Sequence, residues 1–256
     1  MCKIIKYLIN MFKLAVNSIL GLLGWQIRKV PKGGFYYDME KLFFPIYHKC
    51  KAFSMTSVER MYSLYKAIEY IHQYQIPGDI VECGNWRGGS VMLSAMTLQK
   101  LNDTNKKIYL YDTFEGMSAP TSADITHYNE TAKENLRKIK RYLTVSLEGV
   151  KANVYSTAYP KENFIFIKGK VEETIPGILP AQIALLRLDT DWYESTYHEL
   201  KYLFPLISKG GILLVDDYGF WQGARKAVDQ YIRENNIQIL LTRIDPTGRI
   251  AVKLTP

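Results

Sequence analysis

Residues 184–219, ALLRLDTDWYESTYHELKYLFPLISKGGILLVDDYG, decide the fold. The stretch holds two apolar runs, 184–188 and 211–215, with a segment of helical length between them. An apolar run, a helix and a second apolar run predict a βαβ unit whose two strands are buried in a parallel sheet. Ligands bind beyond the carboxyl ends of such strands. The sequence places acids there: Asp189 and Asp191 after the first run, Asp216 and Asp217 after the second.

These carboxylates would repel one another if they converged without a partner, so a bound cation is the economical explanation. Carboxylate oxygens with no His or Cys nearby favour a hard ion such as Mg²⁺ over zinc. The structural alternative is that Asp216 and Asp217 cap the following helix, or that they pair with an arginine. Arg187 and Arg225 are the candidates for that pairing. Two adjacent acids exceed the needs of one helix cap, so we expect a metal site.

A glycine-rich turn follows a short buried strand, residues 79–84, and leads into a helix predicted from about 91 to 101. Glycines at a strand-to-helix turn let a ligand approach the backbone closely, and such a turn alone also suits a dinucleotide. The spacing here is Glu-x-Gly-x-x-x-Gly-Gly, with an acid on the strand itself. This is the shape of the S-adenosylmethionine (SAM) loop of class I methyltransferases. The candidate cofactor residues in it are Glu82, Gly84, Asn85, Arg87, Gly88 and Ser90.

The next predicted strand, residues 107–111, ends in Asp112. An acid at the tip of the second strand is well placed to accept hydrogen bonds from both ribose hydroxyls of a cofactor, in dehydrogenases and methyltransferases alike. The structural alternative is that Asp112 is only a helix cap.

The remaining elements complete the fold. Thr56-Ser57-Val58-Glu59 matches a capping box with Thr56 at the N-cap, and it predicts a helix that stops at residues 76–78. Later elements are predicted as strand 164–169, helix 221–234, strand 238–243, turn 245–248 and strand 249–254. The count is seven strands, of which the last two form a hairpin. A terminal hairpin on a parallel sheet distinguishes the α/β, Rossmann-like class I SAM-dependent methyltransferase fold from a dehydrogenase domain.

Residues 1–34 form a basic amphipathic N-terminal extension before the main domain, residues 35–256. Within residues 1–24 the polar positions recur every three or four residues and share one stripe of a predicted helix. A spanning helix would hold Lys13 near mid-bilayer at a cost of roughly 2.5 to 3.5 kcal/mol. A helix lying in the membrane interface fits best. A helix that docks on its own domain or on a partner subunit remains the alternative, and Gly33-Gly34 is a predicted hinge.

Two segments are candidates for a lid or an acceptor pocket. Residues 35–55 are dense in aromatic side chains, whose faces suit sugar rings. The same side chains could instead strap the extension to the domain. Residues 117–162 form a long polar insertion with helices predicted at 129–141 and 147–155.

The composition narrows the function further. The formal charge of the 256 residues is +8, but six basic residues precede the first acid, Asp38, and the rest of the chain is nearly balanced. This argues against a nucleic-acid-binding face on the main domain. The three cysteines are odd in number and unpatterned, which fits a reducing, cytoplasmic compartment. If residues 1–24 bind a membrane, we expect the protein at the inner face of that membrane. The sequence is also compatible with a homo-oligomer.

From Met55 to its end, roughly four-fifths of its length, the chain resembles the macrocin O-methyltransferase family, which methylates sugar hydroxyls of natural products. The resemblance rests on five motifs in order: PGDIVECGNWRGGS (77–90), YDTFEGM (111–117), VSLEGVKANV (145–154), RLDTDWYEST (187–196) and GGILLVDDYGFWQGARKAVD (210–229). Residues 1–34 have no obvious counterpart in the antibiotic-pathway enzymes.

The resemblance implies a SAM- and Mg²⁺-dependent enzyme. It implies Asp189, Asp216 and Asp217 as metal ligands and Asp191 as the catalytic base. Thr56, Thr113 and Asp189 are added to the candidate cofactor-binding residues.

The chemistry follows from the acceptor. A sugar hydroxyl is a poor nucleophile, because its pKa lies far above neutral. A divalent cation lowers that pKa, and a nearby carboxylate can take the proton. Two other classes stay open: a degenerate methyltransferase fold that acts as a binding module, and a nucleotide-sugar oxidoreductase or glycosyltransferase.

Overall fold

The computed structural model describes residues 3–22, 36–143 and 145–254, and the chain divides into two units, Met1–Glu40 and Lys41–Pro256. The first unit contains helix α1 (Lys3–Gly21), as predicted for the N-terminal extension. The hinge predicted at Gly33-Gly34 lies outside the described residues. No described helix combines the length and the apolar character that crossing a membrane requires.

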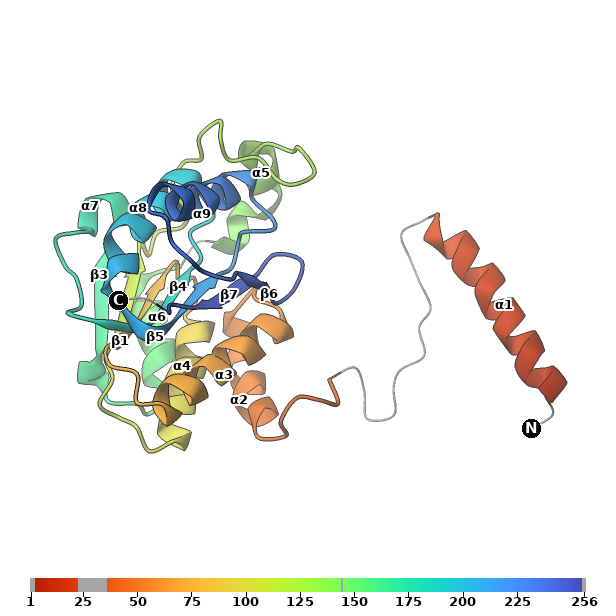
Figure 1. Ribbon diagram of the computed structural model, residues 1–256, viewed down its shortest axis with the longest axis horizontal. Coiled ribbons are helices and arrows are strands. Elements are labelled where there is room, and N and C mark those ends of the chain that lie inside the picture. The colour runs from red at the N-terminus through yellow and green to blue at the C-terminus, as the bar shows by residue number, and fades with distance from the viewer. Residues whose placement is uncertain (1–2, 23–35, 144, 255–256) are drawn as a thin grey trace. The chain divides into compact units, whose positions relative to one another are not determined.

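The second unit is built on a seven-stranded sheet in the order β3-β2-β1-β4-β5-β7-β6 (Figure 1). Strands β1 to β5 pair in parallel, and β7 runs antiparallel to both β5 and β6. The predicted parallel sheet with a terminal hairpin is therefore confirmed. The strands are β1 Asp79–Cys83, β2 Ile108–Asp112, β3 Phe164–Lys168, β4 Ile183–Leu188, β5 Ile207–Val215, β6 Thr242–Arg243 and β7 Arg249–Val252.

The strand order reverses between β1 and β4, and this reversal positions the site. Parallel sheets of this kind form a crevice beyond the carboxyl ends of the strands at the point of reversal. Strand β4 is buried at every position, as expected for a strand covered on both faces. The sequence of β4 carries one charged residue, Arg187, whose side chain must therefore find partners inside the protein.

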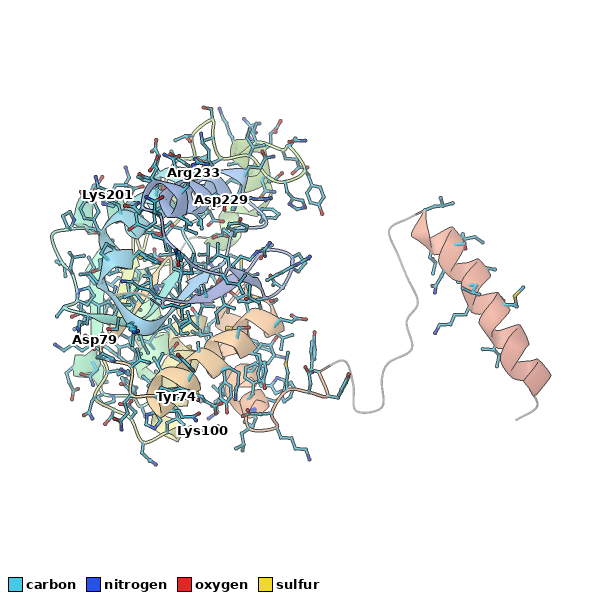
Figure 2. The ribbon with its side chains drawn as sticks, viewed as in Figure 1. Tyr74, Asp79, Lys100, Lys201, Asp229 and Arg233 are labelled. Atoms are coloured by element: carbon cyan, nitrogen blue, oxygen red, sulfur yellow. The ribbon has the colours of Figure 1, made fainter. Side chains whose placement is uncertain are left out.

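Helices cover both faces of the sheet. Helices α2, α3, α4 and α6 pack together on one face, and α7, α8 and α9 pack on the other (Figure 1). The sequence of helix α9 explains why it packs on the sheet with one side only. Ala227, Val228 and Tyr231 are buried, while the charged Asp229 and Arg233 lie on its outer side (Figure 2). The bounds are α2 Phe43–Cys50, η1 Lys51–Phe53, α3 Val58–Gln73, α4 Gly89–Lys100, α5 Ala132–Leu143, α6 Leu147–Tyr155, η2 Lys161–Asn163, α7 Val171–Thr174, α8 Tyr193–Leu203, η3 Phe204–Leu206 and α9 Gln222–Glu234.

The N-cap of α3 is Ser57, and the prediction of Thr56 was wrong by one residue. The Ser57 hydroxyl accepts a hydrogen bond from the backbone N–H of Arg60 at 3.1 Å. The Thr56 hydroxyl instead accepts from the guanidinium of Arg187 at 3.0 Å. Two adjacent hydroxyls can each cap this helix, and a contact far away in the sequence decides which one does.

Other boundaries also differ from the predictions, and two of these differences have a local cause. Helix α5 starts at Ala132 rather than 129, because Thr131 forms a capping box with Glu134: the backbone N–H of each contacts the side chain of the other, at 3.0 and 3.3 Å. Strand β6 is shorter than the predicted 238–243, since Ile239 and Leu241 pack against the core without joining the ladder.

The aromatic segment before α3 contributes to the core through Phe43, which is fully buried. The ring of Phe43 lies 5.1 Å from that of Tyr62 and 5.5 Å from that of Tyr65, both on α3. This part of the segment therefore packs against the core of its own unit.

Candidate active site

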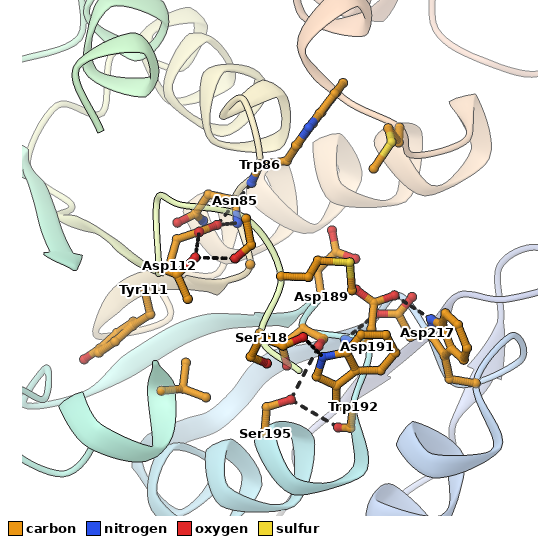
Figure 3. Close-up of a pocket in the computed structure, with 18 of the residues that line it drawn as sticks. Asn85, Trp86, Tyr111, Asp112, Ser118, Asp189, Asp191, Trp192, Ser195 and Asp217 are labelled. Carbon is orange, nitrogen blue, oxygen red and sulfur yellow. Dashed lines mark hydrogen bonds between the residues drawn. The ribbon is translucent and has the colours of Figure 1, made fainter. Parts of the chain in front are cut away.

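A cavity of about 450 Å³ opens at the carboxyl ends of the parallel strands (Figure 3). Its volume lies within the range of roughly 300 to 1,000 Å³ that is typical of small-molecule sites. Its position confirms the one expected from the strand order. The predicted site residues that line it are Thr56, Gly84, Asn85, Ser90, Asp112, Thr113, Asp189, Asp191 and Asp217.

The glycine turn brings the backbone of β1 against that of β4. Gly84 has a φ of 82°, and a Cβ atom there would lie 2.1 Å from the carbonyl oxygen of Asp189. Only glycine fits this approach. Asp112 then fastens the turn: its Oδ2 accepts from the backbone N–H groups of Asn85 at 2.6 Å and Trp86 at 3.2 Å. Residues at the ends of β1, β2 and β4 therefore fix the glycine turn beside the cavity.

Four predicted site residues do not line the cavity, and their direct roles stay predictions. The buried carboxylate of Glu82 accepts from the hydroxyl of Ser90 and from Arg187. The guanidinium of Arg87 lies over the ring of Trp86, 4.7 Å from its centroid. Gly88 is the left-handed N-cap of α4. These three residues belong to the glycine turn or the strand before it, but they do not line the cavity. The fourth residue, Asp216, belongs to a buried ion network.

Arg187 is the centre of that network, with a side chain that is 3% exposed. Its Nε and Nη2 donate to the two carboxylate oxygens of Asp216 at 3.1 and 2.6 Å. Nη1 donates to Glu82 at 2.8 Å, and Nη2 to Asp189 at 2.7 Å. Although burial opposes the charged form, these carboxylates hold the pKa of Arg187 well above its usual value. One guanidinium therefore joins β1, β4 and β5 at the site.

A second arginine, Arg60 on α3, reaches the same carboxylate. Its Nη1 donates to Asp216 at 2.7 Å, and its Nε to Asp245 at 3.0 Å. Asp216 therefore pairs with Arg187, as the structural alternative had it, and also with Arg60. Arg225, the other candidate partner, pairs with Asp229 at 3.6 Å instead.

Asp191 and Asp217 are the acids of the cluster that face the cavity without an arginine partner among the described residues. Asp191 adopts a left-handed backbone conformation, with φ of 69°. Its backbone N–H donates to Asp217 at 3.3 Å, and its Oδ1 accepts from the indole N–H of Trp221 at 2.5 Å.

The electrostatics of this part of the cavity oppose negative charge. Burial raises the pKa of Asp191 to about 6, and the hydrogen bond from Trp221 acts in the opposite direction. Burial, followed by the neighbouring carboxylates Asp191 and Asp189, raises the pKa of Asp217 well above its usual value. A bound cation or a proton would relieve the repulsion among these carboxylates.

Within residues 3–22, 36–143 and 145–254, no three acidic, His or Cys side chains already stand in an ion-binding arrangement. Both oxygens of Asp216 are engaged by arginine, whereas Asp189 offers a second oxygen beside the cavity. The assignment of Asp189, Asp216 and Asp217 as metal ligands stays a prediction.

Several residues of the site escaped the sequence analysis, namely Arg60, Trp192 and Trp221. Arg187 was considered only as an alternative partner. A charged residue in an apolar strand was the available signal for Arg187, because a buried charge requires a partner. The tryptophans carried no comparable signal, since an aromatic residue at a helix start is ordinary.

A family model and several known proteins match most of this chain. The model of the family Macrocin-O-methyltransferase (TylF) matches residues 47–252. The chain is 34% identical over 197 residues to 8-demethyl-8-(2,3-dimethoxy-alpha-L-rhamnosyl)-tetracenomycin-C 4'-O-methyltransferase of Streptomyces olivaceus, covering 77% of this chain and 74% of that protein. It is 32% identical over 197 residues to demethyldecarbamoylnovobiocin O-methyltransferase of Streptomyces niveus, with the same coverage.

A solved structure shares the fold. The O-methyltransferase NovP superposes with a TM-score of 0.72 at 29% identity, covering 79% of this chain and 83% of NovP.

The ion network predicts a large stability effect at Arg187. Replacing Arg187 by Met leaves Glu82 and part of Asp216 buried without their counter-ion, and should lower the free energy of unfolding by about 3 to 5 kcal/mol. Replacing Arg225, whose side chain is 63% exposed, by Met should change it by less than about 0.5 kcal/mol. Urea unfolding of both variants measures the difference. Equal, small effects would contradict the central role of Arg187.

Proposed function

Because the chain belongs to the macrocin O-methyltransferase (TylF) family and is an O-methyltransferase, we propose that it transfers the methyl group of SAM to a hydroxyl of a sugar or glycoside. The observation that carries the proposal is that the glycine turn and the acids Asp189, Asp191 and Asp217 face one cavity. A cofactor on the turn would present its methyl group to an acceptor beside the acids. Family membership favours this function over a binding module or a nucleotide-sugar enzyme of another class.

Three features of the cavity support SAM as the cofactor. Gly84 leaves the backbone open to a ligand. The Oδ1 atom of Asn85, buried at the cavity wall, has no hydrogen-bond donor among the described residues, and a ligand N–H would satisfy it. Asp112 stands at the end of β2, where a carboxylate can receive ribose hydroxyls. Ser90 and Thr113 line the same wall.

We propose that Mg²⁺ binds to Asp189, Asp216 and Asp217. The fit rests on oxygen ligands at the ends of two adjacent strands and on a raised pKa at Asp189 and Asp217, caused first by burial. Asp216 is already held by Arg187 and Arg60, so its role joins stability and metal binding. When bound, the ion would supply Lewis-acid polarisation of the acceptor hydroxyl.

Asp191 is the proposed general base. One of its oxygens, Oδ1, is held by Trp221, which leaves Oδ2 to accept the proton of the acceptor hydroxyl. Methyl transfer also needs the attacking oxygen in line with the sulfonium carbon, which is a positioning task for the cavity walls. Phe53 and Met55 from one predicted lid segment line the cavity, and so do Met117 and Ser118 from the other. This supports an acceptor pocket built from both segments.

We propose that the enzyme is cytoplasmic and that its N-terminal helix brings it to the inner face of a membrane. Helix α1 exposes Phe12, Leu14 and Ile19 among its described side chains. Lys3, Lys6 and Lys13 belong to the same helix, and basic residues beside apolar ones favour an anionic lipid surface.

Cofactor binding is predicted to depend on Asp112. Replacing Asp112 by Ala should weaken the affinity for S-adenosylhomocysteine by about 1.5 to 3 kcal/mol, the range for a hydrogen bond to a charged group. Isothermal titration calorimetry gives the affinity, and Asp229→Ala on the outer side of α9 is the matched control. An unchanged affinity would remove Asp112 from the site.

We predict that different residues of the carboxylate cluster bind the metal and act as the base, so that their substitutions have different effects. Asp189→Asn and Asp217→Asn should lower the apparent affinity for Mg²⁺, and excess metal should partly restore the rate. Asp191→Asn should keep metal and cofactor affinity while kcat falls by roughly 10²- to 10⁴-fold. The assay is transfer of labelled methyl from SAM to a panel of p-nitrophenyl glycosides, with Mg²⁺ titrated for each variant.

Two outcomes of this titration would contradict the mechanism. Recovery of Asp191→Asn by added Mg²⁺ would make Asp191 a ligand rather than the base. Full wild-type activity after exhaustive chelation would refute the metal dependence. Failure to label any glycoside of the panel, with Mg²⁺ and SAM in excess, would contradict the acceptor class.

The membrane proposal predicts salt-dependent lipid binding. The full chain should co-sediment with vesicles that contain phosphatidylglycerol, and less so at high salt, because screening weakens the attraction of its lysines. A chain that begins at Lys32 should remain in the supernatant and keep its methyltransferase activity. If the shortened chain unfolds, helix α1 is part of the core and the proposal is wrong.

A further inference from the structure

The loop that carries Asp191 is held in a conformation that a free chain would rarely adopt. Asp191 has a φ of 69°, a region that side chains other than glycine seldom occupy. Such outliers persist where the surroundings fix them, and they are frequent at active sites. One restraint lies at Thr190, whose hydroxyl donates to the buried carboxylate of Glu199 at 2.9 Å. This restraint fixes the backbone before Asp191 but does not touch its carboxylate.

Trp221 contacts the carboxylate of Asp191 directly. Trp221 is 3% exposed as a residue, and the single donor of its indole, the Nε1–H, points to Oδ1 of Asp191 at 2.5 Å. A hydrogen bond to an ionised acid is stronger than one between neutral groups. The ring of Trp192 lies 5.0 Å from that of Trp221 at an interplanar angle of 69°, and the two form one apolar cluster with Ala132 and Ala224. The indole is therefore packed against Trp192 on one side, while it lines the cavity.

The backbone around Trp221 is fastened by the polar insertion. Thr126 forms a β-bridge to Trp221, and the backbone N–H of Gln222 donates to Ile125 at 2.8 Å. The N–H of His127 donates to the carbonyl of Phe220 at 2.9 Å. Residues 125–127 of the insertion are thus bound to the segment that carries the indole, and they set its position.

We propose that Trp221 is a positioning residue: it holds Asp191 through Oδ1 and thereby directs Oδ2 to the acceptor hydroxyl. This inference rests on the proposed function, in which Asp191 is the base. It gives the insertion a specific task, which is to deliver one indole N–H to one carboxylate oxygen.

The experiment removes the N–H and keeps the ring. Trp221→Phe should lower kcat by about 10- to 100-fold, because misplacing a reacting group by about 1 Å costs on that order. The KM for the glycoside and the affinity for S-adenosylhomocysteine should change by less than about twofold, since neither is bound through the indole N–H. Tyr193→Phe is the matched control: it removes a hydroxyl that donates to Gln230 at 2.8 Å, outside the cavity, and should leave kcat unchanged.

A second variant guards against misfolding. Placing β-(3-benzothienyl)alanine at position 221 exchanges the N–H for sulfur at nearly constant shape, and it should lower kcat as Trp221→Phe does. Full activity of this variant would overturn the proposal, because only the hydrogen bond has been removed.

A double-mutant cycle separates positioning from general support. In an Asp191→Asn background, Trp221→Phe should reduce the residual kcat by less than about twofold, since the partner that it orients is already disabled. An equal loss in both backgrounds would mean a structural role and would overturn the inference.

The two proposals fail in different ways. If Asp191→Asn abolishes activity while Trp221→Phe has full activity, the base assignment stands and only the positioning role fails. If Asp191→Asn is fully active, both fail, because Trp221 then has no base to position.

Discussion

The buried guanidinium of Arg187 is the interaction on which the site depends. It donates to carboxylates at the ends of β1, β4 and β5, and to the hydroxyls of Ser90 and Thr56. The side chain of Arg187 therefore connects the glycine turn to the carboxylate cluster. A guanidinium suits this place because its planar fork donates to several acceptors at once. Its burial is tolerable only while those acceptors stay charged and in place.

A division of labour among the acids follows from this network. Arg187 and Arg60 pair with Glu82, Asp189, Asp216 and Asp245, so those carboxylates are partly or fully committed to structure. Asp191 and Asp217 face the cavity, and no arginine of the described part of the chain pairs with them; their surroundings oppose negative charge. A bound cation or a proton would therefore relieve the repulsion most at these two acids, whereas Asp189 and Asp216 combine an ion pair with their proposed role as metal ligands.

The insertion supplies a second constraint. Residues 117–162 were expected as a lid or acceptor segment, and Met117 and Ser118 do line the cavity. Residues 125–127, however, are hydrogen-bonded to the segment that carries Trp221. Part of the insertion is thus a fixed support for Trp221, and through Trp221 it contacts the loop that carries Asp191.

The sequence by itself determined the sheet, the glycine turn and the acids at the strand ends. These features are local: apolar runs, glycine spacing and the residue that follows a strand are all visible within a few positions. The tertiary structure alone decided which acid pairs with which arginine, that Ser57 rather than Thr56 caps α3, and that Trp221 reaches Asp191. Arg60 and Asp216 are 156 positions apart, and Trp221 and Asp191 are 30 apart. Such pairs form because the fold brings strand ends and loops together, and no periodicity along the chain encodes a contact between side chains so far apart.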